Sequence, residues 1–445
     1  MKTIKMGCLN ALALVLLASI PAMAGETFRW ATTNVVGDAG YWNDPAMWTV
    51  TGTDDDGIPD ADDTVQFGTI KEKQTIAKPV FDGAVYDCHR IAMALRTSAY
   101  VAFTLTFSNG GLRIGAGGVD ISEGNQWQSA SSFSGDFSIE LTADQTWQHN
   151  GSNFYVSGPV SGPYQLTLTG AEGLDLRMLN SGNTFSGGLV QSSGRTVFSA
   201  ASTVEDGALV KGPLGIGSLT LVGGILAATA NVSVYNPVKF SGSRVTLGDS
   251  GKKITFAPDV SDSFVLFSDA NDATRELVAT ADVEIQRTIT EDGASGIAFV
   301  KSGAKTVTLA GTAANGYTGG TSVTQGKLVA KKDGALGTGD VTVTRSALDG
   351  TAALEISAGV VSAISDTAAL RLDGYHGDDG DSLPTLTLGD GVVESVKALY
   401  LDGVAQDSGL TYGGPASAAA VKLDGWFAGT GMVRVSRPGM AVIVR

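Results

Sequence analysis

The sequence is poor in the residues that build disulfide frameworks and common hydrolytic sites. It has two cysteines and three histidines in 445 residues. Cys8 lies in a leader that we expect to be removed, so Cys88 is left without a partner and disulfides cannot hold the fold. The three histidines are far apart and match neither a zinc-ligand spacing nor a nucleophile-elbow motif, which disfavours zinc hydrolysis and serine-histidine catalysis.

Charge, long apolar runs and helical periodicity are also scarce. Charged residues make up 17% of the chain, below the usual 25% or so. No stretch after the leader approaches the roughly 18 apolar residues of a spanning helix, so we expect no membrane-spanning segment in the mature chain. The net charge of −15 excludes nucleic acid as a natural partner.

The first 24 residues have the pattern of a secretory signal. Lys2 and Lys5 precede an apolar run over 11–20, and a small-residue cleavage motif ends at Ala24. We predict cleavage after Ala24, which removes both lysines and brings the net charge to −17. The product is expected to be exported, and to be secreted, held at the cell surface or left in the periplasm.

Glycine and short alternating strands dominate the rest. Glycine accounts for 59 residues, about twice its usual share of 7%. Runs such as "FTLTFSN", "YQLTLTG", "SLTLVGG", "KTVTLAG" and "PTLTLGD" alternate polar and apolar residues and are separated by turn residues. This pattern predicts an all-β protein with many short strands.

An internal repeat distinguishes a solenoid from a sandwich. An aromatic residue, a hydroxyl residue and Gly-Gly occur at 185–188 and again at 317–320. Each copy continues through a strand to a Leu-Gly-x-Gly turn, beginning at Leu214 and Leu336, and into another strand. Such units have one apolar face each and must stack to bury it. With about 20 to 25 residues and about 4.8 Å per coil, we expect a rod on the order of 80 Å long.

We therefore predict a right-handed, single-stranded parallel β-helix with Leu221 and Leu309 in its core. Solenoid ends need caps because they expose unpaired backbone groups. Trp30, Trp42 and Trp48 cluster near the start and indicate an N-terminal cap. The predicted organisation is a signal peptide over 1–24, a capping region over 25–110, β-helix repeats over 111–395 and a closing segment over 396–445.

Three segments of the sequence together carry a resemblance to a known family. The N-terminal segment contributes Trp42, Trp48, Pro59, Asp63, Val65 and Phe67. The interior contributes "QTWQHNGSNFYVSGPVSG" together with the two Gly-Gly units, and the C-terminal segment contributes Leu401 to Gly403, Tyr412, Gly413, Trp426, Gly429 and Gly431. With these residues the sequence resembles bacterial autotransporter-associated β-strand repeat proteins. The resemblance implies a parallel β-helix with a surface or secreted role, adhesive or structural, and transfers no catalytic residue.

The sequence departs from this family in one respect. A complete autotransporter ends in a membrane barrel of many amphipathic strands. This chain ends at Arg445, directly after the strand "GMVRV" and a short tail. We therefore expect no such barrel in this polypeptide.

The acidic run over 54–63 is the most suggestive segment chemically. Calcium takes six to eight oxygen ligands, and carboxylates around a glycine turn can converge on one ion. This pattern makes calcium a possible cofactor, with Asp54, Asp56, Asp60 and Asp63 as its ligands. A solvated acidic loop is the alternative, since the run stands alone and lacks the distal glutamate of an EF-hand.

Two other polar groups have simpler interpretations. The acidic loop over 378–381 beside His376 is expected to be an exposed insertion. Cys88 and His89 are adjacent on a predicted strand, so their side chains point to opposite faces and one of them should be buried.

The leading functional hypothesis is a structural or adhesin-like solenoid without catalytic activity. The alternatives are a module that binds extracellular glycans or cell-surface components and, less favoured, a β-helix polysaccharide lyase or glycosidase. An enzyme should have a groove with convergent carboxylates and basic residues on its flank. A glycan binder should expose aromatic side chains there, for which Tyr235, Tyr375 and Tyr400 are candidates, and a purely structural rod should have neither feature.

Overall fold

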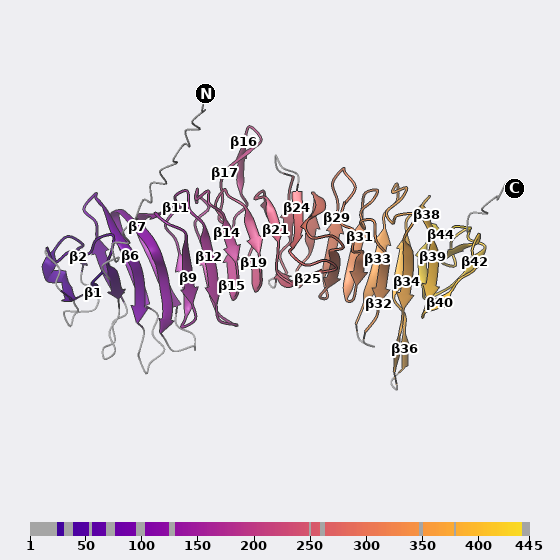
Figure 1. Ribbon diagram of the computed structural model, residues 1–445, viewed down its shortest axis with the longest axis horizontal. Helices are drawn as coiled ribbons and strands as arrows, with labels where there is room; N and C mark the ends of the chain where they lie inside the picture. Colours follow the sequence, from indigo (N-terminus) through magenta and orange to yellow (C-terminus); the bar gives the residue numbers. More distant parts are fainter. Residues whose placement is uncertain are drawn as a thin grey trace, which may run out of the picture.

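The computed structural model is an elongated all-β molecule whose coils follow one another along its long axis (Figure 1). Strands make up 53% of the model and there is no α-helix in its described part. The structure describes residues 25–30, 39–52, 56–67, 76–94, 103–123, 130–248, 251–258, 263–346, 350–377 and 380–437. Nothing in these ranges is a helix long and apolar enough to cross a membrane.

Parallel ladders organise the chain. Leu189 pairs with Leu219 on the next coil, and Leu219 pairs with Val238 on the coil after that. Between residues 219 and 309 each coil contributes one strand to each of three parallel ladders. Along each strand buried and outward-facing residues alternate, as in the buried Leu219 and Leu221 on either side of the half-buried Thr220. The alternating runs in the sequence therefore fold into long parallel sheets that fit a β-solenoid, as predicted.

The first ladder contains β9 (Gln145–His149), β12 (Leu166–Gly170), β14 (Leu189–Gln191), β18 (Leu219–Leu221), β21 (Val238–Phe240), β24 (Ser263–Ser268) and β27 (Thr288–Gly293). The second contains β8 (Ala130–Leu141), β10 (Asn153–Val156), β13 (Asp175–Met178), β15 (Arg195–Phe198), β19 (Ile225–Ala228), β22 (Arg244–Leu247), β25 (Thr274–Ala279), β28 (Ala298–Ser302), β30 (Thr321–Val323), β32 (Val341–Thr344), β34 (Ala369–Asp373) and β39 (Ala398–Leu401). The third contains β20 (Val232–Val234), β23 (Ile254–Phe256), β26 (Val283–Ile285), β29 (Thr306–Leu309), β31 (Gly326–Ala330), β33 (Ala352–Ile356), β37 (Thr385–Leu388) and β43 (Phe427–Gly429).

Both ends combine antiparallel and parallel pairing. At the N-terminal end β1 (Thr27–Trp30) pairs antiparallel with β3 (Trp48–Thr51) and parallel with β4 (Thr64–Phe67), while Trp30 and Trp48 face each other across the antiparallel pair. The Trp48 ring lies edge-on to Trp30 at 4.8 Å and to Trp42 at 4.9 Å between centroids, and its indole N–H donates to the Trp42 carbonyl. The predicted tryptophan cluster is thus a packed aromatic core in the first coils.

The N-terminal elements are β1 (Thr27–Trp30), β2 (Ala39–Tyr41), the 3-10 helix η1 (Pro45–Met47), β3 (Trp48–Thr51), β4 (Thr64–Phe67), β5 (Ile76–Val80), β6 (Val85–Ala94), β7 (Phe103–Glu123) and the short β11 (Val160–Ser161). The C-terminal elements are β38 (Val393–Val396), β40 (Val404–Ala405), β41 (Thr411–Gly413), β42 (Val421–Lys422) and β44 (Met432–Val435). Two antiparallel hairpins leave the coils: β16 (Thr203–Glu205) with β17 (Ala208–Lys211), and β35 (Tyr375–Gly377) with β36 (Gly380–Ser382).

One hydrophobic core extends from Phe28 to Val435. Leu221 and Leu309 are each 1% exposed, which confirms their predicted burial. The predicted boundaries at residues 110 and 395 fall inside β7 and β38, and the signal peptide over 1–24 lies outside the described residues.

The two repeat copies have the same packing. Phe185 and Tyr317 are fully buried. Gly215 and Gly337, in the two Leu-Gly-x-Gly turns, have φ of 71° and 72° and lie directly against those rings. The aromatic residue and the turn glycine are therefore partners in space as well as in sequence.

Several ionisable side chains are enclosed by this core. Lys301 is fully buried, and its ammonium donates to the carbonyls of Ser302, Gly303 and Gln325. Glu394 is also fully buried and accepts hydrogen bonds from the backbone N–H groups of the turn that begins at Ala363. Backbone groups at coil corners thus form hydrogen bonds with both of these buried side chains.

Candidate functional site

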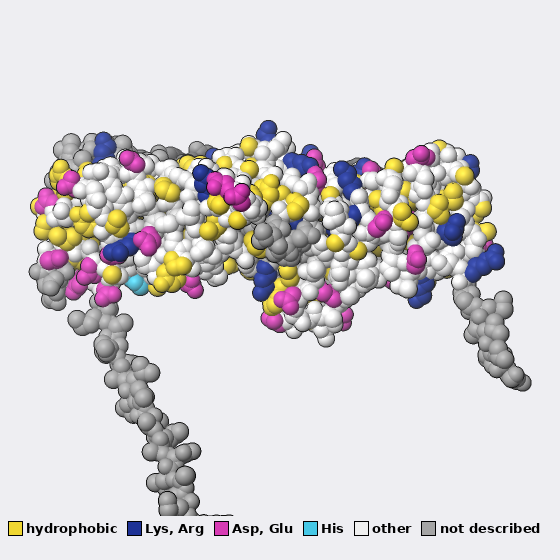
Figure 2. Space-filling view, turned by 90° about the horizontal axis from the view of Figure 1, so that it is seen from above, with side chains coloured by type: hydrophobic (Ala, Val, Ile, Leu, Met, Phe, Trp, Pro, Cys, Tyr) yellow, Lys and Arg dark blue, Asp and Glu magenta, His cyan; other side chains and the backbone are white. Residues whose placement is uncertain are grey.

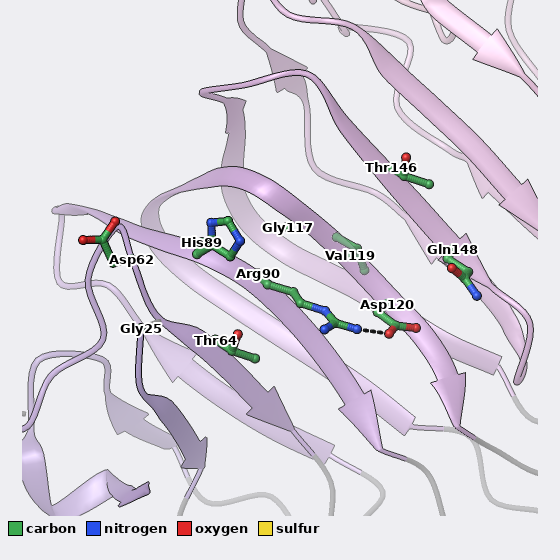
Figure 3. Close-up of a pocket in the computed structure, with 10 residues that line it drawn as sticks. All are labelled: Gly25, Asp62, Thr64, His89, Arg90, Gly117, Val119, Asp120, Thr146 and Gln148. Atoms are coloured by element: carbon green, nitrogen blue, oxygen red, sulfur yellow. Dashed lines mark hydrogen bonds and ion pairs between the residues drawn. The ribbon is translucent and has the colours of Figure 1, made fainter. Parts of the chain in front are cut away.

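A hollow of about 530 Å³ lies on the flank of the solenoid, near its N-terminal end. Four successive parallel strands form its floor, namely β4, β6, β7 and β9. The register places Thr64 beside Arg90 and Arg90 beside Gly118. It also places Asp120 beside Gln148. Residues distant in the sequence therefore lie in two adjacent rows across neighbouring coils, Thr64 and Arg90 in one and Asp120 and Gln148 in the next (Figure 3).

Two glycines create the hollow. A β-carbon on Gly117 would stand 2.6 Å from the Arg90 β-carbon and 2.7 Å from the imidazole of His89. A β-carbon on Gly118, whose φ is 62°, would collide with the Thr146 carbonyl. Glycine is the residue that permits such close approach and positive φ. The side chains of the neighbouring strands β6 and β9 are thus separated on β7 by two positions without side chains, and a depression remains there.

The lining is polar and contains both signs of charge. Arg90 forms an ion pair with Asp120, and Figure 3 shows the two side chains directed toward each other across the floor. Thr146 is exposed, while His89 and Gln148 are half-buried. Asp62 lies exposed at the edge, and Val119 is the apolar side chain among the lining residues. The hollow thus presents hydrogen-bond donors and acceptors with little net charge.

Backbone hydrogen bonds beneath the hollow hold two of its lining residues, His89 and Arg90, in place. The Asp63 carbonyl accepts hydrogen bonds from the N–H groups of His89 at 2.8 Å and Arg90 at 3.2 Å. Cys88, the neighbouring residue, is 1% exposed, so its side chain points into the core while His89 points outward. The predicted opposition of Cys88 and His89 is confirmed. Burial raises the pKa of the Cys88 thiol far above its usual value, which makes it a packing residue instead of a nucleophile.

The acidic run that was predicted to bind calcium lies at the edge of the same coil. Asp54 is outside the described residues. Asp56 and Asp60 are exposed, and each accepts a hydrogen bond from the backbone N–H two residues further along. Asp63 is 2% exposed, and its two carboxylate oxygens accept from the N–H groups of Glu26 and Asp60, each at 2.9 Å.

These contacts give the aspartates a structural role in the loop. Burial is the main cause that raises the pKa of Asp63 to about 6. In the described part of the chain no group of three or more His, Cys, Asp or Glu side chains is arranged to hold a metal ion. Calcium binding by Asp54, Asp56, Asp60 and Asp63 stays a prediction, and a comparison of thermal melting with calcium and with chelator tests it.

The other predicted polar residues lie far from this hollow. His376 is exposed on β35, and its ring nitrogens contact Asp381 at 2.9 Å and Asp402 at 3.0 Å, which raises its pKa. Tyr235, Tyr375 and Tyr400 are half-buried, and the Arg371 guanidinium covers the Tyr400 ring at 4.1 Å. None of these three tyrosines lines the hollow.

A second, smaller hollow of about 410 Å³ crosses the turns after β12, β14 and β18. Glycines at 170, 173, 194 and 224 form much of its floor. Arg195 at its edge pairs with Asp175, which also holds Arg177. Asp175 and Arg195 pair between neighbouring coils, and the lining residues of this hollow include Ser193 and Thr246 but no amide side chain.

Sequence reasoning did not identify the residues of the first hollow. Arg90, Asp120 and Gln148 are separated by about one coil each and carry no local motif. The available signal was "GAGGVD" over 115–120, where Gly117 and Gly118 interrupt a strand pattern. An isolated glycine pair in a strand marks close backbone approach, but only the register shows which polar residues surround it.

Comparisons with known proteins gave no match to a family model, to a curated protein or to a solved structure. The resemblance to autotransporter-associated repeat proteins therefore remains an interpretation of the sequence.

Proposed function

We propose that this protein is an exported right-handed parallel β-helix that serves as a structural or adhesin-like rod and has no catalytic activity. The observation that supports this proposal best is the continuous core from Phe28 to Val435 beneath parallel ladders. A rod of this kind separates two ends and presents a long surface between them. Such geometry suits a mechanical or presenting role, although architecture alone does not fix function.

The handedness and the cap are part of the proposal. Connections between parallel strands of one sheet are right-handed in about 98% of cases, which supports a right-handed coil. The packed tryptophans at Trp30, Trp42 and Trp48 support an N-terminal cap, since they cover the first coil with aromatic contacts.

Export is supported by the predicted signal peptide and by the surface. Figure 2 shows hydrophobic side chains scattered among charged and polar ones on the face that it displays, without one large apolar area. The expected net charge of −17 would favour solubility outside the cell.

Cell fractionation with an antibody against residues 25–445 tests the proposal. We expect the protein on the outside of intact cells, where added protease removes it, or in the medium. Deletion of the gene should reduce attachment of the cells to surfaces or to one another, and complementation should restore it. Retention in the cytoplasm, or release of sugars from a panel of polysaccharides by the purified chain, would contradict the proposal.

A further inference from the structure

We propose that the hollow between β4, β6, β7 and β9 is a binding site for a neutral oligosaccharide. This inference goes beyond the structural role proposed above and assigns a ligand class to one surface of the rod. The chemistry of the lining residues, their net charge and their rigid placement support this ligand class.

The lining offers the groups that sugars require. A neutral saccharide presents many hydroxyl groups, each of which donates and accepts hydrogen bonds. Arg90 supplies donors, Asp120 supplies acceptors, and the Gln148 amide supplies both. The exposed Thr146 adds a hydroxyl on the same strand as Gln148. These polar groups lie in two adjacent rows across the strands, where they can contact neighbouring hydroxyl groups of a sugar ring.

Charge selects a neutral ligand over an acidic one. The Arg90 guanidinium is already paired with Asp120. A uronate, sialate or sulfate would have to displace that carboxylate and would also lie near the exposed Asp62 at the edge. Like charges in one site disfavour each other. A neutral ring can instead bridge the ion pair without breaking it.

Size and rigidity also favour a ligand. The volume of about 530 Å³ is within the range of small-molecule sites, roughly 300 to 1,000 Å³. The side chains of Arg90, Asp120 and Gln148 all come from ladder strands instead of loops. Binding groups on such strands lose little conformational freedom when a ligand arrives.

A glycan array with purified residues 25–445 is the first measurement. The array should contain neutral oligosaccharides beside sialylated, uronate-containing and sulfated ones. We expect binding to a subset of the neutral glycans, unchanged by chelator. The best neutral glycan is then titrated by calorimetry.

Variants locate the binding. Arg90→Gln and Gln148→Ala should each weaken binding of that glycan by about ten-fold or more, because each removes hydrogen bonds to the sugar. Arg113→Gln is the matched control. Arg113 pairs with Asp87 across the same strands β6 and β7, at 2.5 Å and with a similarly exposed side chain, but it does not line the hollow. The control should bind within about two-fold of the natural chain, and all variants should melt within a few degrees of it.

The possible outcomes separate the two proposals. Absence of binding to every neutral glycan, binding of acidic glycans alone, or equal loss in the control and the hollow variants would each overturn the binding site. The rod function would survive all three results, since attachment of cells is measured separately. Cleavage of a bound neutral glycan would instead support the site and contradict the non-catalytic role.

Discussion

Gly215 lies so close to Phe185 that a β-carbon on this glycine would stand 2.6 Å from the aromatic ring. Gly337 repeats the relationship with Tyr317, at 2.7 Å from the ring, in the second copy of the internal repeat. Both glycines also have positive φ, near 70°. The turn and the aromatic residue are therefore fitted to each other, and neither can change alone without strain.

Substitution of Gly215 by alanine should lower the free energy of unfolding by about 2 to 4 kcal/mol, through positive φ and a clash with a buried ring. Gly207 is the matched control, because its φ is 80° and no atom lies within 4 Å of its β-carbon position. Gly207→Ala should cost about 1 kcal/mol from φ alone. Urea denaturation measures the free energy of unfolding of both variants. Equal decreases in the two variants would show that the contact with the Phe185 ring is unimportant.

Lys301→Met should destabilise the rod by about 3 kcal/mol or more. The substitution removes the ammonium that donates to three carbonyl groups and leaves those carbonyls buried without that partner. Lys327, whose side chain is 42% exposed and forms an ion pair with Glu355, serves as control, and its replacement by methionine should cost no more than about 1 kcal/mol. A small effect at Lys301 would mean that water reaches these carbonyls.

His149 should make the protein sensitive to acid. It is fully buried, neither ring nitrogen has a hydrogen-bond partner among the residues that the structure describes, and burial lowers its pKa to about 4 from a usual 6.5. The unfolded chain therefore binds a proton more readily between these values, and stability falls as the pH drops from 6.5 to 4, by up to about 3 kcal/mol. His149→Leu should remove this slope from unfolding free energies measured across that range. If the variant shows the same dependence of stability on pH, His149 is not the cause of the acid sensitivity.

Glu394 should make the stability of the fold decrease as the pH rises, which is opposite to the effect of His149. Burial is the main cause that raises its pKa to about 7 from a usual 4.5, so the folded chain holds a proton that the unfolded chain releases. Stability should fall as the pH rises from 4.5 to 7, again by up to about 3 kcal/mol. Both carboxyl oxygens accept backbone N–H groups, whereas a glutamine amide can accept only one of them. Glu394→Gln should therefore be less stable than the natural chain near pH 5 by about 1 to 3 kcal/mol, but its stability should no longer fall between pH 4.5 and 7; an unchanged fall in the variant would show that another group titrates.

The sequence predicted those features that depend on local alternation. Leu221 and Leu309 were assigned to the core because each belongs to an alternating strand, and Cys88 and His89 were separated because neighbours on a strand face opposite ways. Internal similarity between two segments located the aromatic and glycine landmarks of the repeat. Local pattern thus gave the all-β class, the buried faces and the recurring turn.

The flank hollow could not be predicted in this way. Arg90 and Asp120 meet because of the register between β6 and β7, and that register includes two irregularities. A shift by one residue would turn either side chain to the other face of its strand. The hollow also exists because Gly117 and Gly118 have no side chains. In the sequence, the glycine pair is the only sign of this empty space.

Coils of different length are aligned in the same ladder of this protein, so the turns between strands can accept additional residues. Leu189 and Leu219 are 30 positions apart and Leu219 and Val238 only 19, yet all three are aligned in one ladder. The longer interval includes the β16–β17 hairpin, which projects from the rod (Figure 1). New sequence at such a corner leaves the hydrogen bonds of the ladders intact. The rod is therefore a display scaffold, and the tip at Asp206 and Gly207 is a position where a foreign epitope could be inserted without loss of the folded state.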